Sequence, residues 1–173
     1  MRIIFLDIDG VLNSEAWFHK RNAMRKEGQA IEHPDDAIDP EALERLSHLC
    51  NTTGAKIVIS STWRHGRDAQ FFQDLFQRLH KEFKGEVIDV TPSLRGGHGF
   101  RGNEIHLWMR EHEDLIGPLH DYYDYVILDD DSDMLYWHRN NFLLVDRTVG
   151  LTQGTVFQAR RIFRVPRDED YQS

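Results

Sequence analysis

The stretch Arg2-Ile3-Ile4-Phe5-Leu6-Asp7-Ile8-Asp9-Gly10 decides the fold of this chain. Residues 2–6 are largely apolar, β-branched or aromatic, which predicts a short strand buried on both faces. The apolar run stops at two carboxylates, Asp7 and Asp9. Strands buried on both faces occur in parallel sheets that are covered by helices. In such sheets ligands bind where the strands end, so we expect a functional site at these two acids.

Predicted strands and helices alternate along the rest of the chain. Further strands are predicted over residues 55–59, 86–90, 125–128 and 142–145, and helices over 40–53 and 68–84, from about Asn103 and after Thr152. This alternation predicts the α/β class, with a doubly wound, Rossmann-like, five-stranded parallel sheet. Residues 13–38 are polar and contain Gly28 and Pro34, which predicts a loop or small flap.

Length and composition favour one soluble domain. The 173 residues fit a single domain, which we place over 1–165, followed by a polar tail over 166–173. The net charge of −8 argues against broad, nonspecific nucleic-acid binding, although a local basic strip remains compatible with it. Cys50 is the single cysteine, so an internal disulfide is excluded.

The compartment and the partners are less closely specified. The chain has no apolar run long enough to cross a membrane, and its start does not have the pattern of a signal peptide. We therefore expect a cytoplasmic protein with no membrane partner. The sequence does not determine the oligomeric state.

Polar side chains follow three of the predicted strands. They are Asp7 and Asp9 after the first strand, Ser60, Ser61 and Arg64 after the second, and Asp129 and Asp130 after the fourth. The carboxyl ends of parallel strands share one edge of the sheet, so these groups can converge. Carboxylates that share a pocket repel each other unless a cation compensates them. Oxygen ligands favour a hard cation, and Mg²⁺ is the usual one beside phosphates.

The same segments resemble the motifs of the haloacid dehalogenase (HAD) superfamily of phosphatases. The first motif resembles Asp7-Ile8-Asp9-Gly10-Val11, the second Ile57-Val58-Ile59-Ser60, and the fourth Val126-Ile127-Leu128-Asp129-Asp130. The third motif, a lone Lys or Arg, has two candidates, Arg95 and Arg101. We favour Arg101, because Arg101-Gly102-Asn103-Glu104-Ile105 lies at a predicted helix start, where anions are also stabilised.

The resemblance implies a role for each of these residues. Asp7 would attack phosphorus and become transiently phosphorylated, while Asp9 would act as acid and then as base. Mg²⁺ would be held by Asp7, the Asp9 backbone carbonyl and Asp129, with Asp130 binding a metal-bound water. Ser60 and Arg101 would bind the phosphoryl oxygens, and Ser61 is the alternative hydroxyl.

The substrate would be phosphorylated, and the resemblance narrows its class. The gaps between the motifs are too short for a cap domain, so the site would be open to large substrates. Ile59–Arg64, Arg101–Ile105 and Gly150–Thr152 are similar to HAD domains of RNA-repair proteins, and there is similarity to the 3′-phosphatase module of polynucleotide kinase-phosphatases. That similarity implies a nucleic-acid 3′-phosphate end or a nucleotide as substrate, with Arg64 as a substrate contact.

Several alternatives stay open at this point. Asp133 either binds metal or caps a helix, and Arg64 either contacts substrate or pairs with a surface acid. We expect Trp108 and Trp137 in the core rather than as platforms for base stacking. The protein is alternatively a small-metabolite phosphomonoesterase, or a noncatalytic binding or regulatory module that keeps the HAD fold.

Overall fold

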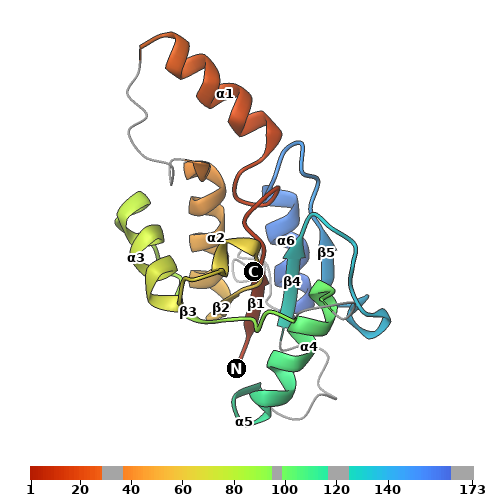
Figure 1. Ribbon diagram of the computed structural model, residues 1–173. Helices are drawn as coiled ribbons and strands as arrows, with labels where there is room; N and C mark the ends of the chain where they lie inside the picture. Colours follow the sequence, from red (N-terminus) through yellow and green to blue (C-terminus); the bar gives the residue numbers. More distant parts are fainter. Residues whose placement is uncertain (29–36, 95–98, 117–124, 165–173) are drawn as a thin grey trace, which may run out of the picture.

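The computed structural model describes residues 1–28, 37–94, 99–116 and 125–164. Five parallel strands form one sheet: β1 (Ile3–Leu6), β2 (Lys56–Ile59), β3 (Val87–Val90), β4 (Tyr125–Asp129) and β5 (Phe142–Leu144). Their order is β3-β2-β1-β4-β5, so β1 lies at the centre (Figure 1). The predicted doubly wound α/β fold is confirmed. The direction of winding reverses between β1 and β4, which makes their carboxyl ends the expected ligand site.

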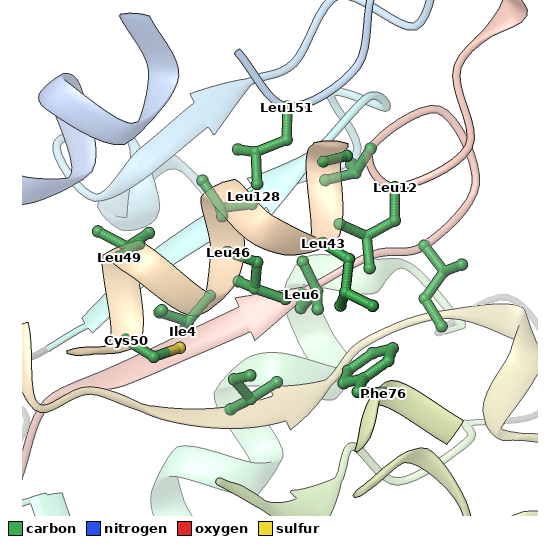
Figure 2. Packing of buried hydrophobic residues seen from close by; sticks show 14 of the residues in the cluster. Ile4, Leu6, Leu12, Leu43, Leu46, Leu49, Cys50, Phe76, Leu128 and Leu151 are labelled. Carbon is green, nitrogen blue, oxygen red and sulfur yellow. The ribbon is translucent and has the colours of Figure 1, made fainter. Parts of the chain in front are cut away.

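Helices cover both faces of this sheet. α2 (Pro40–Thr53), α3 (Ala69–Leu79) and α6 (Gln153–Ile162) pack on one face, and α4 (Arg101–Glu111) packs on the other and is followed by the short α5 (Glu113–Ile116). Figure 2 shows Leu43 and Leu46 of α2 against Ile4 and Leu6 of β1. Each fully buried side chain of this kind stabilises the fold by roughly 1.5–3 kcal/mol. The packing fixes where β1 ends, and therefore where Asp7 lies.

Residues 13–38 differ from the predicted loop or flap. The structure contains a helix there, α1 (Glu15–Lys26), with Ser14 as N-cap, whose Oγ accepts a hydrogen bond from the Trp17 N–H at 3.2 Å. Only Arg21 is buried along α1, and the helix projects from the rest of the molecule (Figure 1). The loop prediction was wrong because this helix has no buried apolar stripe to mark it. Residues 29–36 of the predicted flap lie outside the described residues.

Two helix boundaries also differ from the prediction. α3 ends at Leu79 rather than at residue 84, although Phe83 is still buried in the core. α4 begins at Arg101, because the carboxylate of the distant Asp133 accepts the Arg101 backbone N–H at 2.9 Å. Strand boundaries agree with the prediction to within one residue.

The described segments between the motifs add helices and one strand to the sheet, and none of them forms a separate cap domain. A membrane-crossing helix would need a long apolar stretch, and none of the helices in the described ranges has one.

Candidate active site

Three carboxylates meet at the ends of β1 and β4. The Asp7 N–H donates to the Leu128 carbonyl oxygen at 2.9 Å, which continues the β1–β4 pairing to the edge of the sheet. Asp7, Asp129 and Asp130 each bring one carboxylate oxygen to within 4.8 Å of the others. These three residues are called the acidic cluster below. The structure therefore brings together the three predicted metal ligands that would bind through their carboxylates; Asp9 was predicted to bind through its backbone carbonyl.

Burial disfavours the ionised form of each carboxylate in the acidic cluster. It raises the pKa of Asp7 to about 6, although a hydrogen bond from the Ser61 side chain and the charge of Arg101 act in the opposite direction. Burial also raises the pKa of Asp129 to about 8, and repulsion from Asp7 adds to this. The pKa of Asp130 is raised by burial too, against the attraction of Arg147, whose Nη2 lies 3.0 Å from Asp130 Oδ2. A bound cation would remove this penalty.

The donors of the acidic cluster fit a hard divalent cation such as Mg²⁺. All three are carboxylates, and oxygen-only sites favour hard cations. Asp129 Oδ2 is buried and has no hydrogen-bond partner within the described part of the chain. The Arg101 guanidinium lies 3.4 Å from this oxygen, yet burial keeps the pKa of Asp129 raised to about 8, so a further cation would still be favourable here.

Gly10 allows Asp130 to approach the loop that follows β1. Its φ of +72° lies in the left-handed region that favours glycine. A Cβ at this position would overlap the carboxylate of Asp130. The third residue after Asp7 is therefore restricted to glycine both by its backbone and by the acid beside it.

The Asp9 side chain is exposed and is not part of the acidic cluster, although its charge adds to burial in raising the pKa values of both Asp7 and Asp130. Trp63 Nε1 lies 3.0 and 3.1 Å from the two carboxylate oxygens of Asp9, and Asn13 Nδ2 donates to Oδ1 at 2.7 Å. Three polar contacts thus hold this exposed carboxylate in place. Sequence reasoning missed both Trp63 and Asn13, although each lies within four residues of a motif residue.

The two serines after β2 are both buried but have different surroundings. Ser61 Oγ accepts the Trp63 N–H at 3.4 Å, and the Ser61 side chain lowers the pKa of Asp7 against the larger effect of burial. Ser60 Oγ is buried without a hydrogen-bond partner in the ranges that the structure describes. The sequence favoured Ser60 as the phosphate ligand, and its hydroxyl is the one of the two without a partner among the described residues, whereas Ser61 acts on Asp7.

Whereas Arg147 pairs with Asp130, Arg101 brings a guanidinium to Asp7 and Asp129 of the acidic cluster. Its Nε lies 3.4 Å from Asp129 Oδ2 and its Nη2 lies 3.8 Å from Asp7 Oδ1. The other candidate for the third motif, Arg95, falls outside the described residues. Asp133 acts as a helix cap, since its carboxylate accepts the Arg101 N–H, and it is not part of the acidic cluster. It caps α4, which precedes it in the sequence.

Arg64 was expected to contact substrate, but its side chain is buried and directed at protein groups. Its Nη2 lies 2.6 Å from Glu104 Oε2. Its other N–H groups donate to the carbonyl oxygens of Ser61 at 2.6 Å, Thr91 at 2.9 Å and Pro92 at 3.3 Å. These contacts favour a positioning role, because they fix the backbone of Ser61.

Glu104 completes this buried charge network, and sequence reasoning missed it. Its Oε1 accepts the Leu94 N–H at 3.0 Å, and its Oε2 lies 3.8 Å from Arg101 Nη1. Glu104 thus joins Arg64 to the cation that faces Asp7. The spacing of three residues between Arg101 and Glu104 on one helix is the signal that could have identified the pair.

A comparison with protein families gives a match over most of the chain. The model of a family described as "HAD domain in Swiss Army Knife RNA repair proteins" matches residues 3–156. The matched range contains the acidic cluster, both serines, Arg101 and the Gly150–Thr152 segment. Searches of curated proteins and of solved structures each found no match.

Proposed function

This chain belongs to the family of HAD domains in Swiss Army Knife RNA repair proteins, and from that membership we propose that it is a Mg²⁺-dependent phosphatase with Asp7 as nucleophile. One observation carries the proposal. The carboxylate oxygens of the acidic cluster lie within 4.8 Å of one another, and Arg101 Nη2 lies 3.8 Å from Asp7 Oδ1. A nucleophile, cation-binding carboxylates and a guanidinium are the groups that phosphoryl transfer requires in one place.

In the first step an Asp7 carboxylate oxygen attacks phosphorus. The bond between phosphorus and the leaving oxygen breaks, and that oxygen keeps the bonding electron pair and takes a proton from Asp9. The Arg101 guanidinium and the hydroxyl of Ser60 or Ser61 bind the phosphoryl oxygens. Asp7, Asp129 and the Asp9 backbone carbonyl would hold Mg²⁺, with Asp130 binding a metal-bound water. When bound, the metal neutralises charge on the phosphoryl group and on the clustered acids.

In the second step Asp9 takes a proton from a water molecule, and the water oxygen attacks the aspartyl-phosphate. The bond between phosphorus and Asp7 breaks, which releases inorganic phosphate and restores the Asp7 carboxylate. The surroundings of Asp9 support this double role, because its side chain is exposed to water and lies close enough to Asp7 and Asp130 to add to burial in raising the pKa values of both. Trp63 and Asn13 hold the Asp9 side chain in place.

We further propose nucleic-acid 3′-phosphate ends or nucleotides as substrates, in a cytoplasmic setting. The description of the family, which names RNA repair proteins, supports this substrate class. The absence of a cap domain among the described segments supports it as well, because an open site admits the end of a long strand.

The release of inorganic phosphate from a generic aryl phosphate tests the mechanism. Wild-type protein should release phosphate with Mg²⁺ and should stop when the metal is chelated. Asp7→Asn should abolish release, whereas Asp74→Asn, an exposed acid on α3, should leave it unchanged. Release that persists in Asp7→Asn would reject Asp7 as the nucleophile.

A substrate panel tests the second part of the proposal. The panel contains 3′-phosphorylated oligonucleotides, nucleoside monophosphates and phosphosugars. We expect the largest kcat/KM for one of the first two classes. A clear preference for phosphosugars would instead favour the small-metabolite phosphomonoesterase.

A further inference from the structure

Three large aromatic side chains are exposed beside the start of α4. The exposed fraction is 56% for Phe100, 76% for Tyr136 and 46% for Trp137. Trp108 is buried as expected, but the prediction that Trp137 belongs to the core was wrong. A group of exposed aromatic side chains in one place often marks an interaction site, because soluble proteins rarely expose large apolar patches.

The backbone segments that carry the three residues are packed together. Phe100 is the N-cap of α4, and Tyr136 and Trp137 lie in the short helix η3 (Tyr136–His138). Gly102 lies so close to the backbone of residues 134–135 that a Cβ would overlap it. Farther along α4, the His106 ring lies 5.5 Å from the Trp137 ring, centroid to centroid. Phe100, Tyr136, Trp137 and the neighbouring Arg139 are called the aromatic surface below.

A buried histidine holds this surface in place. His138 is fully buried, its Nδ1 lies 2.9 Å from the Tyr125 hydroxyl oxygen, and its Nε2 lies 3.3 Å from the Gly102 carbonyl oxygen. These contacts join η3 to both β4 and α4. The backbone of η3 is therefore held in place, and it keeps the side chains of Tyr136 and Trp137 exposed.

The charge on the aromatic surface indicates the kind of partner. The Arg139 guanidinium lies 4.2 Å from the centroid of the Tyr136 ring. Phe100 directly precedes Arg101, which faces the acidic cluster. Aromatic rings beside guanidinium groups suit nucleobases, which stack on the rings, and phosphates, which pair with the cations. The surface is thus linked to the acidic cluster through Phe100 and Arg101, which are neighbours in the chain.

We propose that the aromatic surface binds the bases of a single-stranded nucleic acid whose phosphorylated end occupies the acidic cluster. This inference rests on the proposed function, because it names the substrate of the same site. Stacking on an aromatic side chain strengthens binding by roughly 5- to 150-fold per base. Arg139 is the one cation that the aromatic surface itself supplies for backbone phosphates, so the salt dependence of binding should be shallow.

The dependence of kcat/KM on the length of the substrate tests the inference. Single-stranded 3′-phosphorylated oligonucleotides of increasing length are compared with an aryl phosphate. For wild-type protein kcat/KM should rise with length and then level off. Tyr136→Ala and Trp137→Ala should each lose about 5-fold or more of this rise and keep wild-type activity on the aryl phosphate.

A matched control is Phe157→Ala, which removes a side chain of similar exposure, 44%, from α6 on the other face of the sheet. It should keep the full rise with length. A rise that survives in Tyr136→Ala and Trp137→Ala, or one that is equally lost in Phe157→Ala, would overturn the inference. Thermal unfolding of each variant verifies that the fold is intact.

A binding measurement separates this inference from the catalytic proposal. Fluorescence anisotropy of a labelled single-stranded oligonucleotide with Asp7→Asn protein measures binding without turnover. Binding that weakens about 5-fold or more in Asp7→Asn/Trp137→Ala supports the surface even if wild-type protein hydrolyses nothing. Equal binding by both proteins, or no binding, would overturn it. A dimer that dissociates in Trp137→Ala would assign the surface to a second copy of the chain and also overturn it.

Discussion

Replacing Glu104 with glutamine tests the buried charge network that holds Arg101. Glu104 and Arg64 are both buried, and Arg64 Nη2 lies 2.6 Å from Glu104 Oε2. Glu104→Gln keeps the shape of the side chain but removes its charge. In wild-type protein Glu104 Oε1 accepts the Leu94 N–H at 3.0 Å. The NH₂ group of glutamine would face either this N–H or the Arg64 guanidinium, and in both cases two donors would meet.

The size of the effect follows from the burial of the pair. Removing one partner of a buried ion pair costs about 3–5 kcal/mol, because the other charge stays buried without compensation. For a chain of this length each kcal/mol lowers the melting temperature by roughly 2–4 °C. We therefore expect Glu104→Gln to lower it by roughly 6–20 °C. The value of kcat/KM should fall as well, because Arg101 Nη1 lies 3.8 Å from Glu104 Oε2 and loses this neighbour.

The free energy of unfolding is measured by urea denaturation, and kcat/KM with an aryl phosphate. Glu111→Gln is the matched control, since it removes an exposed acid from the same helix. The double variant Arg64→Met/Glu104→Leu should be less destabilised than the sum of its single variants, because both charges leave together. A Glu104→Gln protein within 1 kcal/mol of wild type would refute the reasoning.

Three further predictions concern the acidic cluster and its neighbours. Gly10→Ala should destabilise the protein by about 1–2 kcal/mol or more and should weaken Mg²⁺ binding in a metal titration. Gly66→Ala is the control, since Gly66 has a similar positive φ but open space around it. It should lose only the stability that a positive φ costs an alanine, and should not affect Mg²⁺ binding. Trp63→Phe removes the indole N–H that lies 3.0 Å from Asp9 Oδ1 and should lower kcat by roughly 10-fold with little change in KM; an unchanged kcat would contradict that role. Burial raises the pKa values of Asp7 and Asp129 to about 6 and about 8, so between pH 4 and 8 the folded state binds more protons than the unfolded state. The metal-free protein should therefore lose stability as pH rises through that window, and Mg²⁺ should raise the melting temperature more at pH 8 than at pH 5; an equal or reversed difference would contradict this.

The sheet was predictable from sequence because its strands are short apolar runs. β1, β2 and β4 are buried along nearly their whole length, so no alternation obscures them, and each run stops at a polar group. The meeting of Asp7 with Asp129 follows from parallel pairing alone. The helix α1 was not predictable in this way, because it buries only Arg21 and has no apolar periodicity.

The supporting contacts of the site were beyond sequence reasoning because they join distant positions. Arg64 pairs with Glu104, and Asp133 caps the start of α4 at Arg101. Nothing in the local pattern around these residues specifies which partner the fold brings to them. Trp137 is a similar case, since the residue type alone does not distinguish a core position from an exposed one.

Detection of the phosphorylated enzyme tests the central claim most directly. Wild-type protein is mixed with substrate and Mg²⁺, quenched in acid within the first turnover, digested, and analysed by mass spectrometry. The account predicts one added phosphoryl group on the peptide that contains Asp7, and none in Asp7→Asn. A phosphoryl group on another residue, or turnover with an unmodified Asp7 under conditions that trap such intermediates, would contradict it.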